Sequence, residues 1–497
     1  MTDSPAVEVL ICGAGAAGLT LAIELARRGI SLRLIEKMPT PFPGSRGKGI
    51  QPRTQEIFED QGVLDQLLAT GGLYPPLRQY ASDGSYTQTA VIEAEPPTPA
   101  EPYHHALLVP QFLTEQVLRA RLLALGQRPA FGCELTGFVQ DAQGVTATLT
   151  TAQGEETIRA RYLIGADGGR SYVRHTLEIG FPGKTLGVRA LVADVHLTGL
   201  KADAWHQFNQ GSPAHQLAIC PLAGTDLFQI QAPVPLEGDV DLSPEGLTAL
   251  VAARSGRDDI AVQSVSWASA YSMSARLADR YRVDRVLLIG DAAHVHPPTG
   301  GQGLNTSVQD AYNLGWKLAA VLNGAPDSLL DSYEEERRPI AATMLGLASR
   351  LLDAAKRGDM HRGREVRQLD LGYRESSLAL GTQRSEGLLA GDRAPDAPLR
   401  GAAGQPTRLF ELLRGTHWTL LGYETERKLV SPRPGLHIHM IGARGDLIDE
   451  QNLLRDACAA AVGDWILIRP DGYVAAIVNG NELGALESFL QRQGLSA

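Results

Sequence analysis

The chain has 497 residues and a formal net charge of −10 at pH 7, which predicts two or three domains and argues against nucleic acid or an anionic membrane as a partner. Its four cysteines are scattered without a Cys-x-x-Cys pair, which excludes a zinc ribbon or a disulfide framework and predicts a reduced, cytoplasmic protein. The start MTDSPA lacks a secretory pattern and no apolar run approaches the roughly 20 residues of a membrane span, so we expect neither a leader nor a membrane anchor.

Residues 7–36 predict a strand, a tight turn, a helix and a second strand. An apolar run typical of a buried parallel strand leads into Gly13, Gly15 and Gly18, which form a GxGxxG turn. In such a turn the first glycine permits the bend, the second lets a pyrophosphate approach the backbone, and the third lets the helix pack on the strand. The second strand ends at Glu36, an acid that suits a free ribose 2′-hydroxyl. The unit predicts binding of NAD or FAD; the alternative is a tight turn without a ligand.

Three later segments fit either a cofactor site or ordinary local structure. Residues 46–54 (RGKGIQPRT) place Arg46 in a basic loop with glycines, and a helix predicted over residues 109–126 has Gln111 near its start. At residues 162–174 (YLIGADGGRSYVR) a predicted strand runs into a GxDG loop. Taken alone, the three segments also fit a solvated loop, a helix N-cap and a βα turn.

The stretch GDAAHVHPPTGGQGLNTSVQDA begins at Gly290. A buried strand is predicted to end at Asp291, and a helix to run from about residue 304 to 322. His294 and His296 alternate on an extended segment, but no third ligand with suitable spacing follows, so we expect no metal site. No Lys-Ser/Thr pair follows the glycines, which argues against a phosphate loop. We expect His294 to hydrogen-bond a backbone carbonyl.

Residues 182–278 predict a mostly antiparallel sheet, because apolar runs alternate there with Gly, Pro and Asp turns. Residues 73–109 can contribute further strands to this sheet. Between Ala190 and Ala253 the only Lys or Arg is Lys201. Because a carboxylate ligand would require a cation, this scarcity favours a neutral ligand for the sheet.

The last third of the chain predicts a long helix followed by a small domain. Residues 331–357 form the helix, whose EEERR run at 334–338 is interpreted as a solvated face with i,i+3 and i,i+4 pairs. From residue 391 onward, apolar strands alternate with helical stretches, and Asp471–Gly472 predicts a hairpin turn. Cys458 stands alone, so we expect a structural tail without thiol redox chemistry. Homo-oligomerisation through this tail is left open.

The GxGxxG turn with Glu36, GADGGRSYVR and GDAAHVHPPTGGQGLN occur in an order and spacing that resembles the FAD-dependent aromatic hydroxylases. The tail resembles that of their phenol and polyketide hydroxylase branch. The resemblance implies an α/β fold: a Rossmann-like FAD-binding domain, a mostly antiparallel β-sheet substrate domain and a thioredoxin-like C-terminal α/β domain without CxxC. The implied boundaries are 1–181 for the first part of the FAD domain, with 73–109 able to join the substrate domain, 182–278 for the substrate domain, 279–390 for the second part of the FAD domain with the long helix, and 391–497 for the tail.

By position, the resemblance also implies which residues hold FAD. The implied ADP-side residues are Gly13, Gly15, Ala16, Ala17, Gly18, Glu36 and Lys37. The implied contacts to the pyrophosphate and ribityl region are Arg46, Gln111 and Asp291, and Gly290 is implied as a further cofactor-binding residue. Asp167 resembles the residue that serves FAD binding and, indirectly, nicotinamide binding. The implied flavin-side residues are Pro298, Gly301, Gly303, Leu304 and Asn305. Pro297 and Pro298 are candidates for shaping the substrate side of the flavin, and no catalytic base is assigned.

The resemblance implies a monooxygenase that uses NAD(P)H and O2 to hydroxylate a phenolic or polycyclic aromatic through a flavin hydroperoxide. Because the chain has a single GxGxxG motif, NAD(P)H is expected to dock transiently as a co-substrate. The alternatives with the same cofactor are Baeyer–Villiger or epoxidising chemistry and oxygenation that inactivates an antibiotic. A flavoprotein reductase and a flavin-binding protein without enzymatic activity are the alternatives from other classes.

Overall fold

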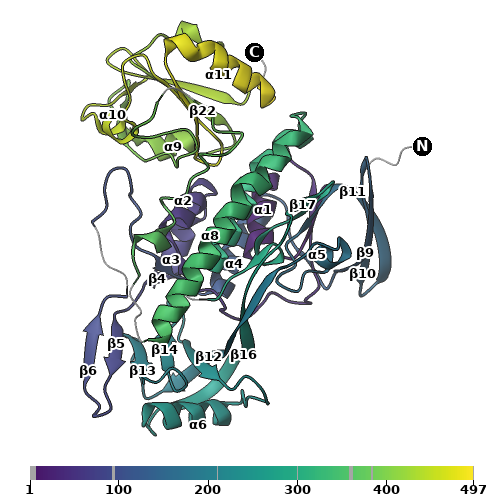
Figure 1. Ribbon diagram of the computed structural model, residues 1–497, viewed down its shortest axis with the longest axis vertical. Coiled ribbons are helices and arrows are strands. Elements are labelled where there is room, and N and C mark those ends of the chain that lie inside the picture. Colours follow the sequence, from purple (N-terminus) through teal and green to yellow (C-terminus); the bar gives the residue numbers. More distant parts are fainter. Residues whose placement is uncertain are drawn as a thin grey trace.

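The computed structural model describes residues 7–91, 96–209, 211–298, 300–357, 362–381 and 384–495. In this part of the chain the strands form sheets of eight, eight, seven and three strands. Figure 1 places the C-terminal sheet at the top and the strands around helix α6 (Pro244–Ser255) at the bottom, with helix α8 (Asp331–Lys356) running between them. The arrangement has the α/β architecture that the sequence predicts.

The first eight-stranded sheet has a parallel centre, in the order β18-β11-β1-β2-β8. Strands β9 and β10 extend β11 as an antiparallel meander, and β17 pairs antiparallel with β18. Because β1 is central, the turn after it opens at the carboxyl edge of the sheet, where ligands bind in such folds. The strands are β1 (Val7–Cys12), β2 (Leu32–Glu36), β8 (Ala130–Phe131), β9 (Glu134–Asp141), β10 (Gly144–Thr151), β11 (Gly154–Gly165), β17 (Arg282–Val283) and β18 (Val286–Leu288).

Helices cover this parallel centre. Helix α1 is buried along nearly its whole length, because the sheet, α4 and α7 all pack against it. Helix α7 is buried for the same reason, although its sequence is only partly apolar. The helices of this region are α1 (Ala16–Ala26), α2 (Pro52–Asp60), α3 (Leu64–Thr70), α4 (Gln111–Ala124), α5 (Tyr172–Thr176) and α7 (Gln302–Leu322).

The second eight-stranded sheet is almost wholly antiparallel; its one parallel pair is β13 with β5. Two strands from the segment 73–109, β5 and β6, extend its edge. The same segment supplies β7 to the three-stranded sheet, and β4 overlaps the start of the segment by one residue. The strands of the large sheet are β5 (Leu77–Tyr80), β6 (Tyr86–Thr89), β12 (Gly183–Thr198), β13 (Trp205–Phe208), β14 (Leu217–Pro221), β15 (Phe228–Val234), β16 (Ala261–Leu277) and β19 (His294–Val295), and those of the small sheet are β3 (Gly49–Ile50), β4 (Gly72–Leu73) and β7 (Leu107–Leu108).

The C-terminal unit is a seven-stranded sheet flanked by short helices. Its hairpin of β25 and β26 turns at Asp471–Gly472, as predicted. Cys458 is buried, and burial raises the pKa of its thiol to about 12, so a reactive thiolate is not populated. The elements are β20 (Pro398–Gly401), β21 (Pro406–Arg408), β22 (Trp418–Tyr423), β23 (Leu436–Ile441), β24 (Leu447–Ile448), β25 (Trp465–Ile468), β26 (Val474–Val478), α9 (Leu409–Leu413), α10 (Leu453–Cys458) and α11 (Leu483–Arg492).

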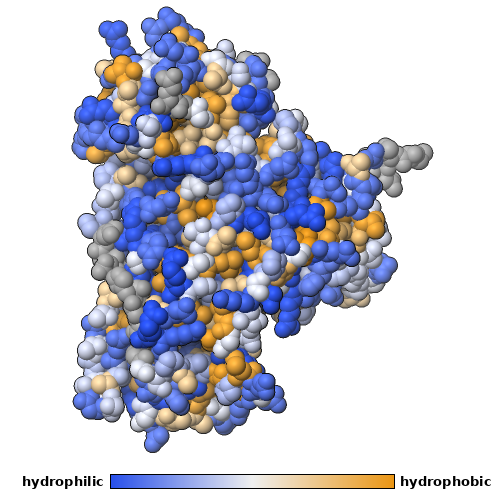
Figure 2. All heavy atoms as spheres, viewed as in Figure 1, coloured by the Kyte–Doolittle hydropathy of each residue, from blue (hydrophilic) through white to orange (hydrophobic). Residues whose placement is uncertain are grey.

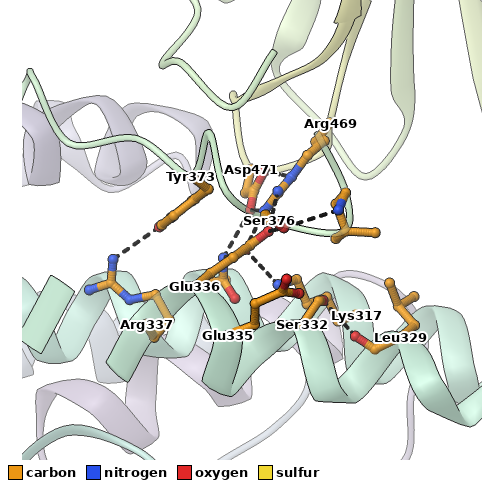
Figure 3. Close-up of polar contacts among 12 residues, drawn as sticks. Lys317, Leu329, Ser332, Glu335, Glu336, Arg337, Tyr373, Ser376, Arg469 and Asp471 are labelled. Carbon is orange, nitrogen blue, oxygen red and sulfur yellow. Dashed lines mark hydrogen bonds and ion pairs between the residues drawn. The ribbon is translucent and has the colours of Figure 1, made fainter. Parts of the chain in front are cut away.

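A buried ion network joins this C-terminal unit to α7 and α8 (Figure 3). The carboxylate of Glu336 accepts hydrogen bonds from Lys317 Nζ at 2.6 Å and from both terminal nitrogens of Arg469 at 2.6 and 2.8 Å. Arg469 also pairs with Asp471, which accepts from the indole of Trp316 at 2.9 Å. Burial alone would raise the pKa of Glu336, but Arg469 and Lys317 hold it well below its ordinary value.

This network corrects the interpretation of the EEERR run as a solvated face. Glu336 and Arg337 are buried, whereas Glu335 is exposed. The run has both buried and exposed members because only some of its positions fall on the packed side of α8.

Figure 2 shows a face of the molecule that is largely hydrophilic, with hydrophobic side chains gathered in smaller areas along its middle. Within the described residues, no helix is both long enough and apolar enough to cross a membrane.

Candidate functional site

The turn between β1 and α1 has the geometry that its glycines predict. Gly13 has φ +110°, and a Cβ there would lie 2.3 Å from the carbonyl oxygen of Ala166. A Cβ on Gly18 would lie 1.9 Å from the oxygen of Gly13, so the helix can pack on the strand only without a side chain. A Cβ on Gly15, by contrast, would have only the carboxylate of Glu115 within 4 Å, at 3.8 Å. The second glycine therefore faces open space, as a pyrophosphate cradle requires.

Glu36 lies at the end of β2, beside this turn. Its carboxylate accepts the backbone N–H of Ala14 and of Met38, each at 3.0 Å. A carboxylate has about four lone-pair positions, so these bonds fix its orientation and leave capacity for ribose hydroxyls. Ala16 and Ala17 begin α1 and Lys37 is exposed just beyond Glu36. The predicted ADP-side residues thus lie together around one turn.

Gly290 and Asp291 form the 3₁₀ turn η1 (Gly290–Ala292) after β18. Gly290 has φ +60°, and a Cβ there would lie 3.0 Å from Ser307 on α7 and 3.2 Å from Ala17 on α1. Because glycine has no side chain, the turn can pack closely against both helices. The side chain of Asp291 is open to solvent, yet protein surrounds it on several sides, and the resulting desolvation raises the pKa of its carboxyl. It therefore lies in a hollow rather than on a convex surface.

The loop after η1 leads into α7, which begins at Gln302, two residues before the predicted start at residue 304. Gly301 has φ +65° at the N-cap, and a Cβ on Gly303 would meet nothing within 4 Å. The first-turn N–H groups of a helix lack intrahelical acceptors, so this end presents free donors and a positive dipole to the open space. The side chain of Asn305 is used internally: it accepts from Gln51 N and donates to the carbonyls of Gly49 and Gly301.

Two predicted residues connect the two halves of the site. Gln111 accepts from Gly47 N at 3.2 Å and donates to Glu115 at 2.8 Å, so it holds the basic loop against α4. Arg46, in the same loop, lies over the ring of Phe42. Burial raises the pKa of both Glu115 and Asp291, and the positive charge of Arg46 opposes this rise in both carboxyls without cancelling it, so Arg46 acts on both sides of the site.

Asp167 supplies the strongest local sign of a missing polar partner. Its Oδ2 accepts the N–H of Val173 at 3.1 Å, whereas among the described residues its buried Oδ1 has no hydrogen-bond partner. Such a group is costly unless a ligand or water satisfies it. Arg174, which sequence reasoning did not assign, donates to the carbonyls of Gly169 and Ala292 at 2.9 Å and so ties the Asp167 loop to η1. The open glycines and this unsatisfied oxygen fit a bound dinucleotide.

The histidine interpretation needs one correction. His294 pairs through Nε2 with the carboxylate of Asp310 at 2.6 Å, and among the described residues its Nδ1 has no partner, so the predicted bond to a backbone carbonyl is not found there. Burial alone would raise the pKa of Asp310, but His294 and Arg337 hold it below its ordinary value. Burial lowers the pKa of His296 to about 3, so this imidazole is neutral. Within the described part of the chain, no group of three His, Cys, Asp or Glu side chains could hold a metal ion.

A cavity of about 560 Å³ is lined both by the loops that carry Arg46, Pro298, Gly300 and Gly301 and by strands of the large antiparallel sheet. These strands include β12, β14 and β15. Pro298 therefore faces the cavity, whereas the buried Pro297 is not part of its lining. Most of the wall is apolar, and the volume suits a drug-sized ring system.

Glu115 is a site residue that sequence reasoning missed, although its place four residues after Gln111 put it on the same helix face. Burial raises the pKa of its carboxyl from 4.5 to about 7. The folded state therefore holds this proton more tightly than the unfolded state, and the free energy of unfolding is highest below pH 4.5. It falls by roughly 3 kcal/mol as the pH rises through 7, because the buried carboxyl must then ionise.

Glu115→Gln should therefore raise the thermal midpoint and FAD retention at pH 8 and change neither at pH 5. Melting curves of the FAD-loaded protein at both pH values test this, with the exposed Glu134→Gln as control; equal gains at both pH values would contradict it.

Comparisons with known proteins agree with this geometry. Residues 6–348 match the family described as FAD binding domain, and residues 388–493 match aromatic-ring hydroxylase, C-terminal. A flavin-dependent monooxygenase of Mycobacteroides abscessus is 42% identical over 476 residues, which cover 94% of this chain and 96% of that protein. A rifampicin monooxygenase of Streptomyces venezuelae is 39% identical over 344 residues, 68% of this chain and 69% of that protein.

The fold is also that of solved hydroxylases. The crystal structure of a ternary complex of aklavinone-11 hydroxylase with FAD and aklavinone superposes with a TM-score of 0.86 at 28% identity, covering 99% of each chain. Its ligands are aklavinone and FAD, which is one of the two cofactors that the glycine motif of this chain predicts. The resemblance inferred from the sequence motifs is confirmed, and the chain belongs to the FAD-dependent aromatic-ring hydroxylases, a family of flavoprotein monooxygenases.

Proposed function

We propose that this monooxygenase takes electrons from NAD(P)H and inserts one atom of O2 into a phenolic or polycyclic aromatic substrate. The observation that carries the proposal is the apolar cavity of about 560 Å³ whose lining includes Pro298, Gly300 and Gly301, beside the start of α7. A ring system in this cavity would lie next to the predicted flavin side of the cofactor site. The cavity is large enough for several fused rings.

Bound FAD would supply the redox and oxygen chemistry, and the chain's own residues would supply binding, orientation and exclusion of water. Glu36 and the glycine turn would hold the ADP half, and Asp291 would accept hydrogen bonds from the ribityl hydroxyls. The N-terminus of α7 would stabilise negative charge on the neighbouring end of the cofactor through its free N–H groups and dipole. Apolar side chains such as Met273 and Leu217 would keep the substrate space dry.

A second candidate is oxygenation that inactivates an antibiotic. It is favoured by the 39% identity to a rifampicin monooxygenase over 344 residues. Both candidates use the same cofactor and the same cavity, so they differ only in the compound that gains oxygen.

The test is aerobic NADPH oxidation by the FAD-loaded protein, with and without a panel of phenols, hydroxylated polycyclic quinones and rifampicin. We expect one compound to accelerate flavin reduction and to gain one oxygen atom by mass. An anaerobic control should reduce the flavin and yield no product. If every active compound yields only hydrogen peroxide or a reduced product, the monooxygenase assignment for this cavity is wrong and a reductase activity replaces it.

A further inference from the structure

A buried lysine lies in the wall of the cavity. Lys48, which is 8% exposed, donates from Nζ to the side-chain oxygen of Gln229 at 2.8 Å, and its ammonium lies 4.6 Å from the centre of the Trp205 ring. Lys48, Trp205 and the neighbouring Gln231 all line the cavity. Burial lowers the pKa of Lys48, because the protein gives its charge less solvation than water would.

The position of this charge is fixed by its hydrogen-bond partner. Gln229 uses both N–H groups of its amide, donating to the carbonyl of Ser45 at 2.5 Å and to Asp194 at 3.2 Å. Its oxygen must therefore face the other way, where it accepts from Lys48 and from Gln231, each at 2.8 Å. Asp194 is the nearby acid, but the amide of Gln229 separates it from Lys48, and burial raises the pKa of its carboxyl.

The charges of the cavity wall are all of one sign. Among the described residues that line it, none is Asp or Glu, and the basic ones are Arg46, Lys48, Arg189, Lys356 and Arg362. Arg46 belongs to the predicted cofactor site, Arg189 donates to the carbonyls of Pro235 and Gly238, and Lys356 pairs with Asp353 at the rim. Lys48 and Arg362 are the buried members of this set.

We infer that the substrate binds with an ionised oxygen, a phenolate or a carboxylate on a fused aromatic ring system, and that Lys48 is its counter-ion. The inference rests on the proposed function only for the choice of the aromatic class. The substrate loses its proton to water before it binds, and no bond to Lys48 forms. The ammonium of Lys48 has three N–H donors, of which two face Gln229 and the thiol of Cys220. A ligand that accepts from the third is preferred strongly when it carries a negative charge, because the surrounding wall is mostly apolar.

This inference reverses the expectation of a neutral substrate. That expectation counted cations only between Ala190 and Ala253, whereas Lys48 reaches the cavity from the loop that precedes β3. The cavity is assembled from distant segments, so the charge of one segment does not decide the charge of its ligand.

The test measures binding to the oxidised, FAD-loaded protein without NAD(P)H, so it requires no turnover. The probes are anthraquinone-2-carboxylate and anthraquinone-2-carboxamide, which share a ring system and differ in charge. Alizarin, whose absorbance moves to longer wavelength when it ionises, is the phenolate probe. By equilibrium dialysis at pH 7 we expect the carboxylate to bind about 10-fold or more tightly than the carboxamide, or alizarin to bind with the spectrum of its anion. The first result identifies a carboxylate substrate and the second a phenolate.

Variants assign the preference to Lys48. Lys48→Met should reduce the carboxylate preference to less than threefold and bind alizarin as the neutral phenol, whereas Lys48→Arg should keep most of the preference. Lys48→Gln, which retains a donor toward Gln229, replaces the Met variant if that variant loses its flavin. The exposed Lys201→Met is the control and should match the wild type.

Two outcomes overturn the inference: a wild type that binds the carboxylate no better than the carboxamide and alizarin only as neutral phenol, or a Met or Gln variant that keeps the anion preference. Either result would leave the proposed oxygenation untouched. Conversely, a protein that fails to oxygenate any compound could still show the anion preference.

Discussion

Replacing Glu336 by Gln should destabilise the protein by about 3–5 kcal/mol, because it leaves buried positive charge without its counter-charge. Lys317, Arg469, Glu336 and Asp471 form a balanced set of two cations and two anions in the interior. The substitution keeps the volume of the side chain and removes only the charge. The loss should appear as a lower urea midpoint measured by circular dichroism at pH 7.

Tryptophan fluorescence should follow the same loss, and two of the five tryptophans of the chain lie at the boundary that the network joins. Trp316 on α7 contacts Trp418 on β22 edge to face, with 5.5 Å between ring centres, and so spans the boundary between the flavin region and the C-terminal unit. Fluorescence of this pair should change at the same urea concentration as the circular dichroism signal. Glu335→Gln is the matched control: the neighbouring carboxylate is exposed and bonds only Ser377 among the described residues, so the cost should stay below about 1 kcal/mol. Equal losses for both variants would contradict a buried network.

Sequence reasoning succeeded where a structural requirement is local. Gly13 and Gly18 are needed because a backbone oxygen lies within 2.3 Å of where each Cβ would be, and any βα turn of this shape repeats that constraint. The strand, turn and helix are neighbours in the chain, so the motif contains nearly all of the information. The same holds for the Asp471–Gly472 hairpin, in which Gly472 has φ +77°.

Sequence reasoning failed where the interacting side chains are distant from each other in the chain. Glu336 pairs with Lys317, 19 residues earlier, and with Arg469, 133 residues later, and a charge run alone does not show which of its members turns inward. One signal was available: Tyr333, Ile340 and Met344 are buried at helical spacing, and Glu336 and Arg337 fall on that stripe. The pairing of His294 with Asp310 was missed for the same reason, because a loop residue was judged without the helix that packs on it.

Replacing Asp291 by Ala should weaken FAD binding about 10- to 100-fold, the effect expected for losing a hydrogen bond to a charged acceptor. The carboxylate lies in a hollow at the end of β18, and Gly290 holds the turn close against α1 and α7. Neither helix depends on the Asp291 side chain, since among the described residues no hydrogen bond of that carboxylate holds them together. The fold should therefore survive while the cofactor dissociates. The measurement is the flavin-to-protein absorbance ratio after gel filtration, followed by titration of the apoprotein with FAD.

The pH dependence separates a ribityl contact from a general weakening of the site. Desolvation raises the pKa of Asp291, so the wild-type carboxylate protonates at a higher pH than an exposed aspartate and loses its charge-assisted bonds there. Retention of FAD by the wild type should fall as the pH drops through that raised pKa, whereas Asp291→Ala should show no such step. Asp291→Asn, which keeps an acceptor oxygen without charge, should retain FAD to an intermediate degree, and the exposed Asp258→Ala should behave as the wild type. If Asp291→Ala remains fully yellow with an affinity within threefold of the wild type, the ribityl chain is held elsewhere.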